Sequence, residues 1–120
     1  MIKEFTSQLQ VISESNSREH WRKAHVRHKY QKLHIRLALL DNKIPQNLPV
    51  IITLTRLSPR KLDSDNLQTA FKYVRDTIAD HFIPGKAPGR ADDEPSFEWR
   101  YDQIQSKDKG IHLHFEWPDQ

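Results

Sequence analysis

The strongest constraint on the fold is a change in the period of apolar residues near the middle of this 120-residue chain. Residues 50–57 are rich in β-branched and aliphatic side chains, which predicts a strand in the centre of a sheet. The apolar residues that follow recur at the helical period: Leu67, Ala70, Phe71, Val74, Ile78 and Phe82. A strand followed by an amphipathic helix indicates a layer of helix packed on a sheet.

The first third of the chain predicts one strand and one long helix. Residues 2–12 follow a two-residue period, with Phe5, Leu9 and Val11 on one side. Asn16 and Glu19 form a capping-box pattern that begins a helix extending to about Leu40. We expect one continuous apolar stripe of this helix to pack on the core: Val26, Tyr30, Leu33, Leu37 and Leu40.

The last third predicts two more strands after a long loop over residues 84–95. Residues 97–101 and 111–117 alternate apolar with polar side chains around a polar turn, which is typical of a β-hairpin. We therefore expect one α+β domain over residues 1–120, with a mixed sheet of about four strands and two main helices.

Composition excludes several classes of protein. The apolar runs are far shorter than the ~20 residues that a membrane-spanning helix needs. The N-terminus has no apolar segment typical of a secretory signal. The chain contains no cysteine, so no disulfide framework is possible and a reducing cytoplasm is the expected location.

Basic residues are concentrated in the predicted first helix. Residues 18–36 contain seven Lys or Arg and one Glu, a local charge of +6, so the rest of the chain carries −3 of the total of +3. Such a cluster attracts polyanions and binds them less tightly in salt. A solvated helix face explains the same pattern, and the sequence leaves both interpretations open.

Two groups of carboxylates are candidates for chemistry. Asp63, Asp65 and Asn66 lie where the central strand gives way to a helix, a position at which helix capping alone would explain an aspartate. The spacing of the two aspartates also allows both to bind one hard cation. Asp92 and Asp93 precede the next strand, so three or four carboxylates are expected to meet at a Mg²⁺ or Mn²⁺ site.

Residues 60–68 read Arg-Lys-Leu-Asp-Ser-Asp-Asn-Leu-Gln and are followed by an amphipathic helix and an Asp-Asp pair. Over residues 50–117 this pattern resembles the RusA-type Holliday-junction resolvases. The resemblance implies that Asp63, Asp65 and Asp93 are catalytic metal ligands, with Asp92 adjacent. It also implies a homodimer that cuts four-way DNA junctions with Mg²⁺ or Mn²⁺ in DNA recombination and repair, typically encoded by a phage or prophage.

One position departs from the family pattern. Thr69 stands where the family has a catalytic lysine, and a threonine cannot pair ionically with a phosphate. Lys72 or Arg90 are possible replacements. A second hypothesis is therefore a non-catalytic DNA-binding or interaction module with the same fold. The residues expected to contact DNA are Arg18, Arg22, Lys23, Arg27, Arg60, Lys61, Asn66, Lys72 and Arg90, although Asn66 is better suited to orienting an aspartate.

Histidines and aromatic residues offer weaker alternatives. His112 and His114 share one face of the last strand, a spacing compatible with a transition metal, but a polar sheet face is the favoured interpretation. A metal cluster of His20, His25 and His28 is disfavoured, because histidines scattered among Arg and Lys more often contact phosphate or water. Three alternating aromatics suggest either a base-stacking platform or, more simply, core packing: Phe97, Trp99 and Tyr101. Trp21 is a candidate for DNA contact or for a dimer.

Overall fold

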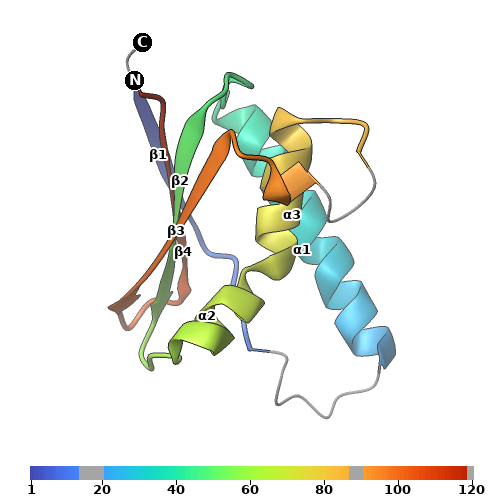
Figure 1. The fold of residues 1–120 in the computed structure, drawn as a ribbon. Coiled ribbons are helices and arrows are strands. Elements are labelled where there is room, and N and C mark those ends of the chain that lie inside the picture. Colours follow the sequence, from blue (N-terminus) through green and yellow to red (C-terminus); the bar gives the residue numbers. More distant parts are fainter. Residues whose placement is uncertain (14–20, 87–90, 119–120) are drawn as a thin grey trace.

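A computed structural model describes residues 1–13, 21–86 and 91–118. Helices cover one face of a four-stranded sheet, and the opposite face of the sheet is open (Figure 1). The elements are β1 (Ile2–Ser7), α1 (Trp21–Asp41), β2 (Val50–Ser58), α2 (Ser64–Ala70), α3 (Lys72–Phe82), the 3-10 turn η1 (Ala91–Asp93), β3 (Phe97–Gln105) and β4 (Gly110–Glu116). The α+β class and the mixed sheet are confirmed. Within the described ranges, no helix has both the length and the apolar character needed to cross a bilayer.

The strand order is β1-β4-β2-β3, and it places β2 inside the sheet as predicted. β2 pairs with β3 in parallel, from Val50 opposite Phe97 to Ser58 opposite Gln105. β4 pairs antiparallel with β1 on one side and with β2 on the other. The chain between β2 and β3 forms α2 and α3 and crosses one face of the sheet, as a parallel connection requires.

The predicted hairpin of the last two strands is wrong. β3 and β4 are consecutive in sequence, but β2 lies between them in the sheet. Alternation of apolar and polar residues reports which face of a strand is buried and says nothing about its neighbour. Phe97 is buried and Trp99 and Tyr101 are half-buried against the core, so these aromatics serve packing as the simpler interpretation predicted.

The second predicted helix is broken into α2 and α3 at Phe71, which has φ −91° and ψ 3°. The apolar positions predicted for this helix are all buried. The start of α2 is held beside β3 by two hydrogen bonds: the Leu62 amide donates to Gln103 Oε1 at 2.9 Å, and Gln103 Nε2 donates to the Leu62 carbonyl at 2.7 Å. At Phe71 the chain bends, so α3 runs in a different direction from α2 (Figure 1).

The predicted orientation of the first helix is also wrong. The capping residues Asn16 and Glu19 lie outside the described residues, and α1 is described from Trp21 to Asp41. Its buried residues are Gln31, Ile35 and Leu39. The predicted stripe is on the opposite side and exposed, with Leu33 at 56% and Leu37 at 51%. Two apolar faces compete on this helix, and the shorter one packs against α3.

The N-terminal strand is shorter than predicted, because it leaves the sheet after Ser7 while Leu9 and Val11 remain buried in the core. At this point the chain passes Gly110 so closely that a Cβ there would lie 2.3 Å from the carbonyl oxygen of Ser7. Contacts this short force a displacement of backbone, since the neighbouring atom is not the end of a flexible side chain. The close passage therefore requires glycine.

Gly110→Ala is expected to destabilise the protein by about 1–3 kcal/mol, because the new methyl group overpacks this backbone contact. Urea denaturation would measure the change in the free energy of unfolding. Lys109→Ala, at the exposed neighbouring position, is the control and should change it by less than about 0.5 kcal/mol. Equal stability of the two variants would contradict the close contact.

Candidate active site

The start of α2 is organised by Asp63, which caps the helix. Its Oδ1 accepts a hydrogen bond from the amide of Asn66 at 2.9 Å, and its Oδ2 accepts one from Asn66 Nδ2 at 3.0 Å. The hydroxyl of Ser13 donates to Asn66 Oδ1 at 2.6 Å. Both oxygens of Asp63 are therefore used locally. The capping explanation accounts for Asp63, and Asn66 orients it as expected.

The other residues of this turn face solvent. Asp65 is exposed in the first turn of α2, and its carbonyl accepts a hydrogen bond from Thr69 Oγ1 at 2.9 Å. Arg60 and Lys61 are exposed just before the helix. The turn thus presents two basic side chains and one free-standing acidic side chain, a composition suited to contact with a phosphate backbone through Arg60 and Lys61.

The second predicted pair, Asp92 and Asp93, lies in η1. Asp93 is exposed, whereas the Asp92 side chain is only 15% exposed, and its Oδ2 forms an ion pair with Arg75 Nε at 2.9 Å. The carbonyl of Asp92 accepts hydrogen bonds from Trp99 Nε1 at 2.9 Å and from Arg75 Nη2 at 3.4 Å. Asp92 is therefore held from both its side chain and its backbone.

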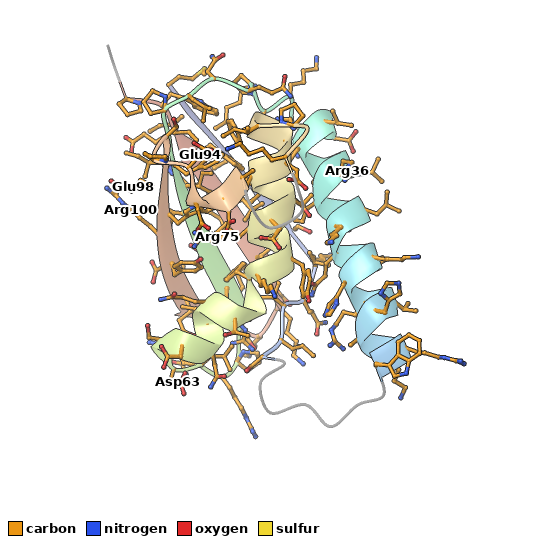
Figure 2. The ribbon with its side chains drawn as sticks, turned by 45° about the vertical axis from the view of Figure 1, so that its right-hand side comes forward. Arg36, Asp63, Arg75, Glu94, Glu98 and Arg100 are labelled. Atoms are coloured by element: carbon orange, nitrogen blue, oxygen red, sulfur yellow. The ribbon has the colours of Figure 1, made fainter. Side chains whose placement is uncertain are left out.

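Arg75 is fixed in its turn by β3. Its Nη1 donates to the hydroxyl of Tyr101 at 2.8 Å, and its guanidinium carbon lies 4.7 Å from the centre of the Trp99 ring. Figure 2 shows Arg75 in the centre of the molecule, between the sheet and the helices. A half-buried guanidinium with a carboxylate, a hydroxyl and an aromatic face around it is a rigid support for Asp92.

Two further carboxylates on α3 lie within electrostatic range of Asp92. Partial burial raises the pKa of Asp76, and the negative charge of Asp92 raises it further, while Lys72 and Lys32 act in the opposite direction. Burial also raises the pKa of Asp80, with Arg36 and Lys32 opposing and Asp92 contributing to the rise. We call Asp76, Asp80 and Asp92 the carboxylate cluster.

Basic side chains from two helices flank the carboxylate cluster. Lys72 on α3 and Lys32 on α1 each place Nζ 5.4 Å from the centre of the Tyr73 ring. His28 stacks on the same ring with centroids 3.7 Å apart. The seam between α1 and α3 therefore carries cations next to carboxylates whose ionisation is already disfavoured. Perturbed carboxylates with nearby cations are typical of functional sites.

The predicted meeting of all four aspartates does not occur. Asp63 lies at the lower end of the molecule in Figure 2, well away from Arg75, which holds Asp92. The reason is the parallel pairing of β2 with β3. A residue that follows β2 and a residue that precedes β3 lie at opposite ends of the sheet, because the two strands run in the same direction. Asp63 and Asp65 thus lie at one end of the sheet, and Asp92 and Asp93 lie towards the other.

Sequence reasoning missed Arg75, Asp76 and Asp80. The two aspartates are four residues apart on one side of α3, so they share a face of the helix. That spacing was visible in the sequence, on the polar side of the most strongly periodic helix. Without the position of η1, nothing in the sequence indicated that Asp92 would face the same side.

The remaining predicted contacts are distributed as follows. Arg22 and Lys23 are exposed near the start of α1, and Arg27 is half-buried, while Arg18, His20 and Arg90 lie outside the described residues. Trp21 is 66% exposed, with the Arg22 guanidinium 5.4 Å from its ring centre.

His112 and His114 face the open side of the sheet, where Nε2 of each approaches the Glu4 carboxylate at 3.2 Å and 3.6 Å. This is the polar sheet face that the sequence favoured.

A divalent cation is compatible with part of the carboxylate cluster. Among the described residues, no group of three or more His, Cys, Asp or Glu side chains is arranged to hold a metal ion. Mg²⁺ seldom uses such a cage, because it keeps several waters and binds through one or two carboxylates together with substrate phosphates. Asp92 Oδ1 is buried and has no hydrogen-bond partner in the described structure. Among the predicted carboxylates, Asp92 is thus the one with a buried oxygen left for a cation, and Asp76 is a neighbour whose pKa its charge raises.

Comparison with known proteins gives no assignment to a family. No protein-family model matches the chain, and a search of curated proteins finds no match.

Proposed function

We propose that this protein is a metal-dependent endonuclease that cleaves branched DNA in the cytoplasm, as the RusA-type resolvases that its sequence resembles do. The observations that carry the proposal are the buried Oδ1 of Asp92, which has no hydrogen-bond partner in the described structure, and Asp76 close enough that the charge of Asp92 raises its pKa, with Lys72 and Lys32 nearby. Burial and the charge of Asp92 disfavour ionisation of Asp76 and raise its pKa, and a divalent cation at this position would offset both effects. A phosphodiesterase needs this combination of acidic ligands and nearby cations.

Each residue of the site has a separate role in this proposal. A bound Mg²⁺ or Mn²⁺ would activate water and neutralise charge on the phosphate. Arg75 keeps Asp92 in one orientation through the 2.9 Å ion pair. Lys72, one helical turn before Asp76, takes the place of the lysine that Thr69 replaces and holds a phosphate oxygen. A homodimer is part of the proposal, because cutting two strands symmetrically calls for two related sites.

Basic residues near the starts of α1 and α2 are proposed to contact the DNA backbone. Arg60 and Lys61 lie before α2, and Arg22 lies near the start of α1. Each phosphate contact releases counterions, so binding should weaken steadily as salt concentration rises. These contacts position the DNA and carry no base sequence by themselves.

The test is cleavage of a synthetic four-way junction, compared with linear duplex and single-stranded DNA of matched sequence, in Mg²⁺, in Mn²⁺ and in chelator. A double variant, Asp76→Asn with Asp92→Asn, is purified in parallel as a control for contaminating nucleases. We expect symmetric nicking of the junction alone, dependent on metal and absent in the double variant. Nicking that persists in the double variant, or in chelator, would contradict the assignment of the site.

A second candidate function is a DNA-binding module without turnover. The observation in its favour is that Asp63 is consumed in capping and Thr69 bonds its own helix, so the motif shared with the nucleases has a structural explanation here. The same assay separates the two functions. Salt-sensitive binding to the junction with no cleavage in either metal would establish the binding module and exclude the nuclease.

A further inference from the structure

The outer face of α1 exposes large apolar side chains to solvent. Five large side chains lie along it, all more than half exposed: Val26 at 66%, Tyr30 at 59%, Leu33 at 56%, Leu37 at 51% and Leu40 at 60%. The opposite side of the same helix buries Ile35 and Leu39 almost completely. The outer face of α1, defined by these five residues, is therefore additional to the face that holds the helix on the protein. Contiguous apolar surface of this kind marks an interaction site.

We infer that the outer face of α1 is the contact between two copies of this chain, with the two helices antiparallel and the two-fold axis at Leu33. The positions of the stripe favour this arrangement, since Val26 and Leu40 each lie seven residues from Leu33. In the antiparallel pair, Val26 of one copy is level with Leu40 of the other, and Leu33 meets Leu33. A two-fold contact requires such self-complementarity.

The charges at the two ends of the helix also favour an antiparallel pair. Lys23 and Asp41 are exposed and are 18 residues apart, which is five turns of helix, so they lie on the same side of α1. Antiparallel packing brings Asp41 of each copy close to Lys23 of the other, and the two-fold axis makes two such ion pairs. A parallel pair would leave Lys23 and Asp41 at opposite ends of the interface, where they could form no ion pair.

A groove beside the stripe provides room for the second copy. It lies between α1 and β1, has an open volume of about 460 Å³, and is lined by Phe5, His34, Leu37 and Asp41 among others. Tyr30 lies on the same side of α1 as Leu37, and in the antiparallel pair it is level with the neighbourhood of Leu37 in the other copy. The Tyr30 ring would therefore reach the mouth of this groove.

The remaining charges limit the strength of the contact. Lys29 and Arg36 flank the other side of the stripe, where antiparallel packing brings them towards their counterparts, although Asp80 partly offsets Arg36 within each copy. The stripe exposes on the order of 500 Å² per copy, so two copies bury about 1,000 Å², the lower limit for a specific interface. We therefore expect a dimer with a dissociation constant in the micromolar range that tightens as salt screens the repulsion.

The experiment is sedimentation equilibrium of the full chain over protein concentrations from about 1 to 500 μM, a range that brackets micromolar affinity. We expect the mass to rise from monomer to dimer, with tighter association in higher salt. Leu33→Glu, which places two carboxylates at the axis, should remain monomeric. Ile104→Glu, at an apolar position that is 54% exposed on β3, should dimerise like the wild type. A monomeric wild type, or loss of the dimer in Ile104→Glu alone, would overturn the inference.

A charge exchange tests the orientation of the helices. Asp41→Lys should weaken the dimer about tenfold, and the double variant Asp41→Lys with Lys23→Asp should restore it, because the two ion pairs are re-formed with reversed sign. Failure of the double variant to recover would exclude the antiparallel arrangement. This inference does not depend on catalysis. A dimer that does not cleave DNA would contradict the proposed nuclease but not the inferred interface. A monomer that cleaves DNA would contradict the interface but not the nuclease.

Discussion

Phe71→Ala is expected to lower the free energy of unfolding by about 3–5 kcal/mol. Phe71 is fully buried at the junction of α2 and α3, and its ring packs against Tyr101 with centroids 6.2 Å apart. Removing it leaves a cavity where the two helices turn, and the turn itself then lacks the side chain that holds it on the sheet. Urea denaturation followed by circular dichroism would measure the loss.

Two variants separate the cavity from general effects of truncation. Phe71→Leu keeps most of the volume and should cost about 1 kcal/mol. Leu37→Ala, on the exposed outer face of α1, should change the stability of the monomer by less than about 0.5 kcal/mol. A loss in Phe71→Ala no larger than that in Leu37→Ala would show that the helix junction does not depend on this ring.

Asp76→Asn is expected to reduce metal-dependent cleavage of the junction by at least about 100-fold while making the metal-free protein more stable. The two effects have opposite signs because the ionised carboxylate is proposed to bind the metal but destabilises the folded protein when no metal is bound. Burial and the charge of Asp92 raise the pKa of Asp76 in the folded state above its ordinary value of 3.8. Ionised Asp76 therefore destabilises the fold at neutral pH, and the neutral amide removes this effect. The gain should stay below about 1 kcal/mol, because Asp76 retains contact with solvent.

The pH dependence of this gain follows from the direction of the shift. A carboxylate with a raised pKa contributes stability that is fully present below the unfolded value and is lost as pH rises through the folded value. The advantage of Asp76→Asn over the wild type should thus be largest near pH 7 and disappear below about pH 4, since both side chains are then neutral. Thermal melts in chelator across this range would measure it. Asp108→Asn, an exposed carboxylate in the turn before β4, is the matched control and should alter neither stability nor cleavage.

A gain in melting temperature on adding Mg²⁺ would report binding without relying on turnover. Ligands that bind only the folded state stabilise it in proportion to the logarithm of their concentration. We expect the wild type to show this gain and Asp76→Asn to lose most of it. Equal stabilisation of both proteins by Mg²⁺ would remove Asp76 from the metal site, even if cleavage itself had been lost.

The parts of the fold that could be predicted are those in which a residue pattern has one physical cause. The β-branched run at residues 50–58 forms an interior strand, with Val50, Ile52 and Leu54 buried against the helices and neighbouring strands on both sides. The helical period from Leu67 to Phe82 reports a single buried face, and every apolar position is buried as expected. Asp63 was likewise predictable as a cap, since its spacing to Asn66 fits the orphan amides of a helix start.

The errors arose where a pattern has two possible causes or where the partner is distant in sequence. On α1 the longer apolar stripe was assigned to the core, but the core face includes Gln31 and contains fewer apolar residues. The position of β4 next to β1 and β2 depends on contacts between residues 2 and 116, which no local pattern records. The carboxylate cluster depends on the same long-range order, because only the parallel β2–β3 pairing separates Asp92 from Asp63 and brings it beside α3.

The strand order also determines when each strand can pair during synthesis. β1 precedes the other described strands, yet its neighbour in the described sheet, β4, ends at Glu116. β2 likewise waits for both of its neighbours, which lie beyond residue 96. All pairing in the described sheet is therefore between strands far apart in sequence, because β3 and β4, which follow each other closely, are not partners. The helices can pack on one another while the ribosome is still translating, but β2 gains its first partner only when β3 has emerged, and β1 gains its partner only when β4 has emerged.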